Sequence, residues 1–408
     1  MIAFAHHIRR KVLAGAASAA LQIVLSCRDA TAAEPAADIH PFRFGASLDQ
    51  PHPPVEARQS NRLPDPETVG HHRRRLTIKM EAFVSRLSTN GSLGSTYGAV
   101  LFPRVQASYF GCVLGLSGLA TNWRLAAELW RLPTIIGEAL YLCAGAIWVV
   151  FTLLFLTKWA LARDEALAEF SNPVQSCFVG LLGVSSMLIA LGVLPYSWLA
   201  GVSLFAFGAI FTVVFGVWLT GSLWEGNRDP VSTTAALYLP AGAGSFVTAI
   251  AASAFGHSNW SQLAFGAGFF SWLAIESVVL HRLLTNKELP ELLRPMLGIQ
   301  LAPPAVGCLA YLSGTTGHPD PLSHALFGYG LLQLLILARL IPWIRRQPLD
   351  LSYWGITFGL TALTSASMKM AARTDGPVLG MIAPFLLIIS SAIVLAIAIG
   401  SIRWLLKR

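Results

Sequence analysis

From Arg104 to the C-terminus, apolar residues form ten long blocks separated by short polar gaps. Five blocks are strongly apolar and long enough to cross a bilayer, which takes roughly 20 residues as a helix. These are residues 133–158, 196–219, 260–284, 322–343 and 377–404. The other five are shorter or less apolar, namely residues 107–121, 173–193, 238–255, 295–313 and 352–372. They are rich in Gly, Ala, Ser and Thr, which suits the inside of a bundle because small residues let backbones approach.

The two kinds of block alternate, which predicts five helical hairpins, each with an inner and an outer helix. The hairpins begin at nearly regular intervals, near Ala107, Pro173, Tyr238, Pro295 and Ser352. A repeat of nearly constant period indicates one structural unit used several times. Five hairpins around an axis leave a central space that can be a pore. The sequence therefore predicts an all-α membrane protein with ten transmembrane helices.

Composition and charge agree with a lipid environment. The chain is 54% hydrophobic and 12% charged, with a mean hydropathy of +0.58, whereas soluble domains carry about 25% charged residues. A net charge of +8 would suggest nucleic-acid binding in a soluble protein. Here the basic residues gather in every second gap between the blocks, as in cytoplasmic loops, so no nucleic-acid partner is predicted. Ten spans with this bias place both termini in the cytoplasm.

Residues 1–100 differ from the rest of the chain. They hold Pro-rich stretches and a basic run at residues 73–75 without helical or strand periodicity, which predicts disorder. Residues 9–25 resemble a signal peptide, but a cleaved signal would reverse the orientation that the loop charges predict. We therefore expect either an unstructured cytoplasmic tail or an overlong start, with Met80 as the true initiator. The membrane domain spans residues 101–408.

No enzyme motif is present. The chain lacks a Gly-rich phosphate loop, an H-E-x-x-H pair and a G-x-S-x-G elbow. None of its five cysteines belongs to a C-x-x-C pair, and its adjacent histidines lie in the N-terminal tail. We therefore expect no catalysis, no cofactor and no metal site.

Two acids, Glu138 and Glu276, interrupt apolar blocks. Ionisable groups inside a membrane are costly, so each needs a partner or a role. Glu276 and Arg339 lie at comparable depth in two outer blocks, so we expect them to form a structural ion pair. The alternative is that Glu276 is a proton-coupling carboxylate.

Prolines and glycines mark the inner blocks. Proline inside a helix removes a backbone hydrogen bond and bends the helix, and the freed carbonyl must find a partner or line a water-filled cavity. We expect such kinked or pore-lining positions at Pro240, Gly244, Pro303, Pro304 and Gly359. The alternative is that the kinks serve packing alone.

Six segments in order resemble the tellurite-resistance/C4-dicarboxylate transporter family. They are NPVQSCFVGLLGVSSMLIALG, ALYLPAGAGSFVTA, FGAGFFSWLAIESVVLHRL, RPMLGIQLAPPAVGCLAYLS, LFGYGLLQLLILARLIPWI and YWGITFGLTALTSAS. The resemblance covers about residues 104–404. It is strongest to the bacterial TehA branch, which is related to the plant slow-type anion channels.

This resemblance implies ten helices in five hairpins around a pseudo-five-fold axis. It implies that the odd helices line a central pore, that Phe358 blocks this pore midway, and that the subunits form trimers. We therefore expect a phenylalanine-gated channel for small monovalent anions in the bacterial inner membrane, assembled as a homotrimer. The alternative is a proton-coupled C4-dicarboxylate or sulfite transporter of the same family.

Overall fold

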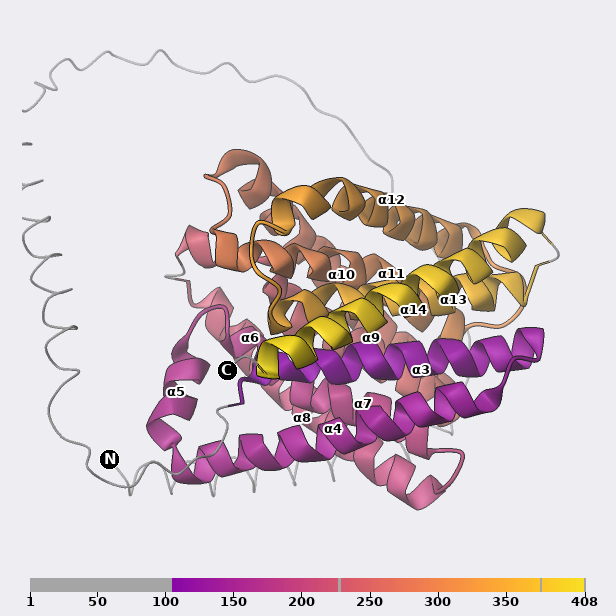
Figure 1. Cartoon of the computed structure of the whole chain (residues 1–408), viewed down its shortest axis with the longest axis horizontal. Coiled ribbons are helices and arrows are strands. Elements are labelled where there is room, and N and C mark those ends of the chain that lie inside the picture. The colour runs from indigo at the N-terminus through magenta and orange to yellow at the C-terminus, as the bar shows by residue number, and fades with distance from the viewer. Residues whose placement is uncertain (1–104, 227–228, 375, 407–408) are drawn as a thin grey trace, which may run out of the picture. The chain divides into compact units, whose positions relative to one another are not determined.

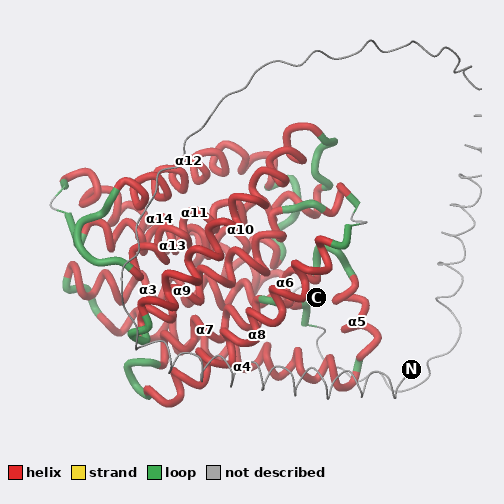
Figure 2. The backbone as a smooth tube through the Cα atoms, turned by 180° about the vertical axis from the view of Figure 1, so that it is seen from behind, coloured by secondary structure: helices red, strands yellow, loops and turns green. Residues whose placement is uncertain are grey.

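The computed structural model describes residues 105–226, 229–374 and 376–406, and every element among them is a helix (Figures 1 and 2). Within these described ranges, eight helical segments are long and apolar enough to cross a membrane. The loops between them gather at the two ends of the bundle (Figure 2). The protein is therefore an all-helical, multi-pass membrane protein. The predicted N-terminal tail and Met80 lie outside the described residues.

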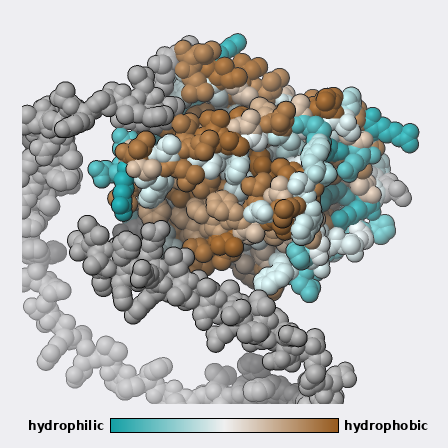
Figure 3. Space-filling view, turned by 90° about the horizontal axis from the view of Figure 1, so that it is seen from below, coloured by the Kyte–Doolittle hydropathy of each residue, from teal (hydrophilic) through white to brown (hydrophobic). Residues whose placement is uncertain are grey.

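Five long helices, here called the outer helices, expose most of the apolar surface. They are α4 (Thr134–Leu161), α8 (Trp198–Trp224), α10 (Ser258–Thr285), α12 (Pro321–Ile344) and α14 (Pro377–Leu406). Only 11% to 33% of the residues in their apolar stretches are buried. Large side chains such as Leu142 and Phe270 point outward. The resulting apolar surface covers the middle of the face in Figure 3, with hydrophilic residues toward its ends, as a bilayer requires.

Five other segments, here called the inner segments, are mostly buried. Their helices are α3 (Gly111–Trp130), α6 and α7 (Ser176–Val179 and Leu181–Val193), α9 (Gly244–Ala254), α11 (Ala302–Gly314) and α13 (Gly355–Ala371). The segments of α7, α9 and α11 are among the eight candidate spans, and 78% to 89% of their apolar stretches are buried. Helix α13 has only 17 residues, and α3 carries Arg124 and Glu128 in its second half. The predicted spans at these two helices therefore stay predictions.

Each inner helix packs against the outer helix that follows it in the chain, as α3 does against α4 in Figure 1. The inner helices also pack on one another in order: α3 on α7, α7 on α9, α9 on α11, α11 on α13, and α13 on α3. Small residues permit this close approach. A Cβ on Gly115 or Gly118 of α3 would collide with the hydroxyls of Thr357 and Thr361 of α13. The abundance of small residues in the inner blocks thus has a direct packing role.

Four inner segments begin with turns that are not α-helical. The 3₁₀ helices are η1 (Ala107–Phe110), η3 (Ala235–Leu237), η5 (Glu291–Leu301) and η6 (Leu351–Trp354), and a π-helical turn, η4 (Leu239–Ala243), precedes α9. Pro240 lies in the π turn, while Pro303 and Pro304 lie in the first turn of α11. A proline in the first turn removes no intrahelical hydrogen bond. The kink expected at Pro303 and Pro304 is therefore not a break inside an α-helix. These prolines follow the point where the 3₁₀ helix η5 ends and α11 begins.

Two short helices complete the described chain. Helix α5 (Arg163–Ser171) follows α4, and η2 (Pro230–Ser232) follows α8. Glu169 of α5 accepts hydrogen bonds from Lys158 and from the backbone amide of Ala107, the latter at 2.7 Å. This contact ties the beginning of the first inner segment to the end of α4.

Candidate functional site

A cavity of about 390 Å³ lies at the end of the bundle where the inner segments begin. Every inner segment contributes to its wall, through residues that include Tyr109, Phe178, Ala243, Met296 and Phe358. Segments far apart in the sequence thus share one enclosed space. The cavity is the structural feature that a transport pathway would need at this end.

The cavity lining changes from polar to apolar along the inner segments. Its polar residues precede the inner helices or lie near their first turns: Gln106, Ser108, Gln175, Asp350 and Ser352. The lining residues furthest along each inner segment are Leu114, Leu181, Ala243, Ala302 and Phe358, all of them apolar. Among the polar residues, Asp350 caps η6 by accepting a 2.9 Å hydrogen bond from the amide of Ser352. The cavity therefore has a polar mouth and an apolar inner end.

The 3₁₀ helix η5 supplies a straight apolar stripe to the wall. Leu293, Met296 and Ile299 all line the cavity, and each is three residues from the next. A 3₁₀ helix has three residues per turn, so side chains at this spacing lie directly above one another. In an α-helix, with 3.6 residues per turn, side chains three residues apart point in successively different directions and would not all face the cavity.

Phe358 lies at the apolar end of the cavity, as a gate residue would. Its side chain is 8% exposed, and it is the fourth residue of α13. The start of α13 is held in place by Trp354, whose indole nitrogen donates a 2.9 Å hydrogen bond to Ser401 of α14. The structure therefore places Phe358 on a fixed helix beside the cavity, and its blocking role remains a prediction.

The other expected pore-lining residues are not part of the cavity wall. These are Pro240, Gly244, Pro303, Pro304 and Gly359, whose neighbours Leu239, Ala243, Ala302 and Phe358 line it instead. A Cβ on Gly244 would collide with Thr212 of α8, and one on Gly359 would lie 2.8 Å from the amide nitrogen of Ala302. The two glycines therefore allow helices to pack closely, and a pore-lining role for the five residues beyond this cavity stays a prediction.

Glu276 has partners other than the one expected. Its Oε2 accepts hydrogen bonds from the Tyr238 hydroxyl at 2.6 Å and the Trp272 indole at 3.0 Å, and its Oε1 accepts one from the Tyr329 hydroxyl at 2.6 Å. Arg339 is exposed, ten residues beyond Tyr329 on α12. The predicted ion pair between Glu276 and Arg339 is therefore wrong. Neutral donors hold the buried carboxyl instead, and they join α10 and α12 to the base of α9.

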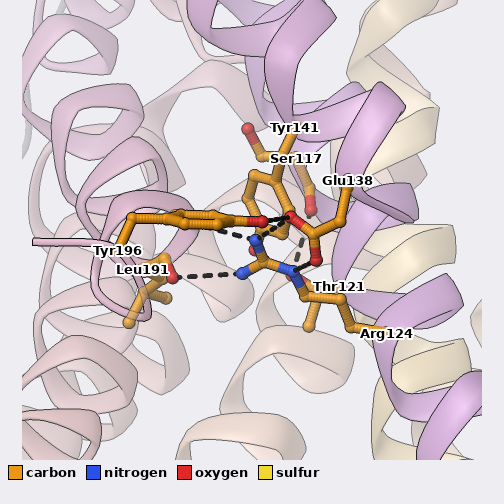
Figure 4. Close-up of polar contacts among 8 residues, drawn as sticks. Ser117, Thr121, Arg124, Glu138, Tyr141, Leu191 and Tyr196 are labelled. Carbon is orange, nitrogen blue, oxygen red and sulfur yellow. Dashed lines mark hydrogen bonds and ion pairs between the residues drawn. The ribbon is translucent and has the colours of Figure 1, made fainter. Parts of the chain in front are cut away.

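A second polar cluster, drawn in Figure 4, gathers round Arg124 in the second half of α3, whereas the cavity lies where α3 begins. Arg124 of α3 donates to both carboxylate oxygens of Glu138 on α4, from Nε at 2.8 Å and from Nη2 at 2.7 Å. The guanidinium also donates to the carbonyls of Leu191 and Gly192 at the end of α7, at 3.4 Å and 3.0 Å. The Tyr196 hydroxyl donates to Glu138. Arg124 thus joins the first hairpin to the second.

The ring of Tyr141 completes this cluster by supporting the guanidinium. The centre of the ring lies 4.1 Å from the Arg124 guanidinium carbon, within the range of a cation–π contact. The Tyr141 hydroxyl shares a 2.6 Å hydrogen bond with Thr121. The sequence reasoning noted Glu138 but not this partner. The predicted blocks did not signal it, because Arg124 falls in the polar gap after residue 121. In the structure α3 extends to Trp130, so that Arg124 and Glu138 lie on either side of the turn between α3 and α4.

Comparison with known proteins agrees with the arrangement. The profile of the family described as SLAC1, voltage-dependent anion channel, matches residues 104–402. The chain is 32% identical over 309 residues to a tellurite resistance protein TehA homolog of Haemophilus influenzae, covering 75% of this chain and 92% of that protein. It is 24% identical over 314 residues to the S-type anion channel SLAH3 of Arabidopsis thaliana, covering 73% of this chain and 48% of the plant protein.

A third relative is archaeal. The uncharacterized transporter MJ0576 of Methanocaldococcus jannaschii is 24% identical over 284 residues, which cover 64% of this chain and 82% of that protein. The family profile spans most of this chain, and the bacterial relative is matched over nearly its whole length. The resemblance to the tellurite-resistance/C4-dicarboxylate transporters is thereby confirmed, and the chain belongs to the SLAC1 family of voltage-dependent anion channels.

Proposed function

We propose that this protein conducts small monovalent anions, such as chloride and nitrate, through a pore between its inner segments. The observation that carries the proposal is the cavity, which takes lining residues from every inner segment and has Phe358 at its apolar end. Membership of a family of anion channels supports the same function. The protein is then a transport protein and not an enzyme.

In this proposal the chain forms ten transmembrane helices, arranged as five hairpins around a pseudo-five-fold axis. The packing of successive inner helices, with α13 returning to α3, supports that arrangement. The pore continues from the cavity along the axis, and the ring of Phe358 closes it. Removing the ring would open the path.

Anions would be held only weakly beside the cavity. Of the described residues that line it, none is Lys or Arg. Conduction needs sites that an ion can leave as easily as it enters. A lining of amides, hydroxyls and apolar side chains meets that requirement better than a ring of fixed positive charges.

We also propose that the protein lies in the bacterial inner membrane as a homotrimer, with both termini in the cytoplasm. Basic residues at the cavity end of the bundle support the orientation, because cytoplasmic loops are enriched in Lys and Arg. Four of them are Lys158, Arg163, Arg294 and Arg345. The cavity mouth would then face the cytoplasm.

The direct test is the chloride conductance of Phe358→Ala in planar bilayers or oocytes. We expect a larger conductance than that of the wild type, because the truncated side chain no longer fills the pore. Phe270→Ala is the matched control, since Phe270 is 71% exposed on α10 and should leave the conductance unchanged. Background current from normally inserted Phe358→Ala would overturn the gate assignment.

The alternative is a proton-coupled C4-dicarboxylate or sulfite transporter, which the buried carboxyl of Glu276 favours. The reversal potential separates the two functions. For a channel it follows the chloride gradient and ignores pH. For a coupled transporter, uptake of the dicarboxylate or sulfite follows the proton gradient and is lost in Glu276→Gln.

A further inference from the structure

Phe358 and Lys369 lie on the same face of α13. They are eleven residues apart, which is about three turns at 3.6 residues per turn and leaves their directions about 20° apart. Helix α13 is continuous from Gly355 to Ala371. Phe358 lines the cavity. Lys369 therefore lies on the face of α13 that lines the cavity, three turns further toward the other end of the bundle.

Helix α11 shows the same relationship. Ala302 lines the cavity, and Ser313 follows it by eleven residues on one continuous helix. The Lys369 ammonium donates a 3.1 Å hydrogen bond to the Ser313 hydroxyl. Ser253, at the end of α9, donates to the Ser313 carbonyl. The far ends of α9, α11 and α13 are therefore joined through Ser313, which Lys369 contacts.

The positive charge of Lys369 is not neutralised by an ion pair with any described residue. Arg124, by contrast, is paired with Glu138. The charged groups near enough to interact with Lys369 are Arg373 and Glu128. Arg373 lies one turn further along and donates a 2.7 Å hydrogen bond to the Leu312 carbonyl, which fixes a second positive charge beside the first.

A further hydrogen-bond donor lies one turn closer to Phe358. Ser365, four residues before Lys369, donates to Oδ1 of Asn122 on α3. The Asn122 side chain is fully buried, and its amide nitrogen has no acceptor among the described residues. A buried donor without an acceptor is unfavourable, and an anion on this side of α13 would offset that cost.

We propose that Lys369 and Ser313 form an anion-binding site at the end of the pore opposite the cavity. The inference rests on the proposed function, because the site recruits the same small anions that the pore conducts. The lysine raises the local anion concentration by attraction. It also makes the two ends of the pathway chemically different, since the described cavity lining holds no cation.

The test compares Lys369→Gln and Lys369→Arg in the Phe358→Ala background. At about 0.01 M chloride the Debye length is about 30 Å, and at about 1 M it is about 3 Å. We expect Lys369→Gln to lower the conductance several-fold in the dilute solution and very little in the concentrated one. Lys369→Arg should keep the conductance of its parent at both concentrations, because it keeps the charge.

A charge-restoring experiment separates the site from a structural role. Lys369→Cys in the same background is inserted first and then treated, from the side opposite the cavity, with thiol reagents that add a positive or a negative group. The positive reagent should restore the low-salt conductance and the negative reagent should lower it further. Phe358→Ala without the added cysteine is the control for the native thiols, of which Cys143 is exposed.

The outcomes distinguish the two proposals. If Phe358→Ala conducts but neither the Lys369 variants nor the reagents change its low-salt conductance, the binding site is wrong and the pore stands. If Phe358→Ala carries no current, the gate assignment is wrong, and chloride binding to purified protein, followed by ³⁵Cl line broadening, tests the site directly. Broadening that is equal in wild type and Lys369→Gln would overturn it.

Discussion

Arg124 and Glu138 are joined by two nearly parallel hydrogen bonds, with Nη2 of the guanidinium 2.7 Å from Oε2 of the carboxylate. Both side chains are partly exposed, at 19% and 32%, and the Tyr196 hydroxyl donates a further hydrogen bond to Glu138. The paired geometry fixes how α3 and α4 meet. Since Arg124 also holds two carbonyls of α7, it is the central residue of this contact.

Loss of either member of this pair should destabilise the bundle. We expect Arg124→Met and Glu138→Met each to lower the free energy of unfolding by about 1.5–3 kcal/mol, as for hydrogen bonds to charged groups. The double variant should lose less than the sum of the two, because the interaction is removed only once. Unfolding in detergent measures this, with Arg163→Met, at an exposed position, as the control. Strict additivity would contradict the coupling.

Glu276 should matter for folding far more than Arg339. Replacing Glu276 with Ala leaves the donors of Tyr238, Trp272 and Tyr329 without their acceptor, at about 1–3 kcal/mol for each buried group left unpaired. We expect a clearly lower melting temperature and a low yield of Glu276→Ala, and a wild-type melting temperature for Arg339→Met. Thermal melts of the purified variants check this. An equal loss of melting temperature in the two variants would support the predicted ion pair between Glu276 and Arg339 and contradict this prediction.

The glycines of α3 should be intolerant of even one methyl group. Gly115→Ala places a Cβ against the Thr357 hydroxyl, and overpacking of this kind typically costs about 1–3 kcal/mol. Gly145→Ala is the matched control, because a Cβ there meets nothing within 4 Å. The melting temperature should fall for Gly115→Ala and hold for Gly145→Ala. Combining Gly115→Ala with Thr357→Ala should recover part of the loss.

Asp320 should give the bundle a measurable dependence on pH. The Tyr311 hydroxyl donates to its Oδ2 and the Ser323 amide to its Oδ1, at 2.9 Å for the latter. Chiefly through the Tyr311 hydrogen bond, the pKa of Asp320 lies below its ordinary value. The carboxylate therefore stabilises the folded state above the unfolded pKa of about 3.9, and this stabilisation is lost as the pH falls through the folded pKa.

The corresponding measurement compares Asp320→Ala with wild type at two pH values. At pH 7 the variant loses the N-cap of α12, for which about 1 kcal/mol is typical. Near pH 3 the difference in unfolding free energy should shrink. Tyr311→Phe should also reduce the pH dependence, since it removes the principal cause of the lowered pKa. A difference that stays constant from pH 7 to pH 3 would refute this account of Asp320.

The length and apolarity of the blocks predicted most of the membrane segments, because spanning a bilayer constrains both properties strongly. The small-residue content predicted which segments are buried, and Gly115 shows why. Phe358 was identified through the family resemblance, since a single aromatic residue in an apolar helix carries no local signal. Its place at the cavity was visible only after the fold brought the five inner segments together.

The errors arose where side-chain direction decides the contact. Glu276 and Arg339 were matched by depth, but depth does not say which face of a helix a residue occupies. Tyr329, which does reach Glu276, was one aromatic residue among many in its block. Similarly, Pro303 indicated a break in helix geometry without saying that a 3₁₀ helix would precede it. Only the structure showed that the 3₁₀ geometry of η5 places Met296 and Ile299 on the cavity wall.

The apolar inner end of the cavity has a consequence for water. In the proposed pore, an ion that passes Leu114, Leu181 and Phe358 must bring part of its hydration shell, and a narrow space lined by hydrocarbon tends to dry. Width alone then does not set the conductance of the pathway. Phe358→Ser, with a small hydroxyl side chain, should keep the pore more hydrated than Phe358→Ala, with a methyl group. The polarity and the size of the side chain at position 358 should then affect the conductance separately.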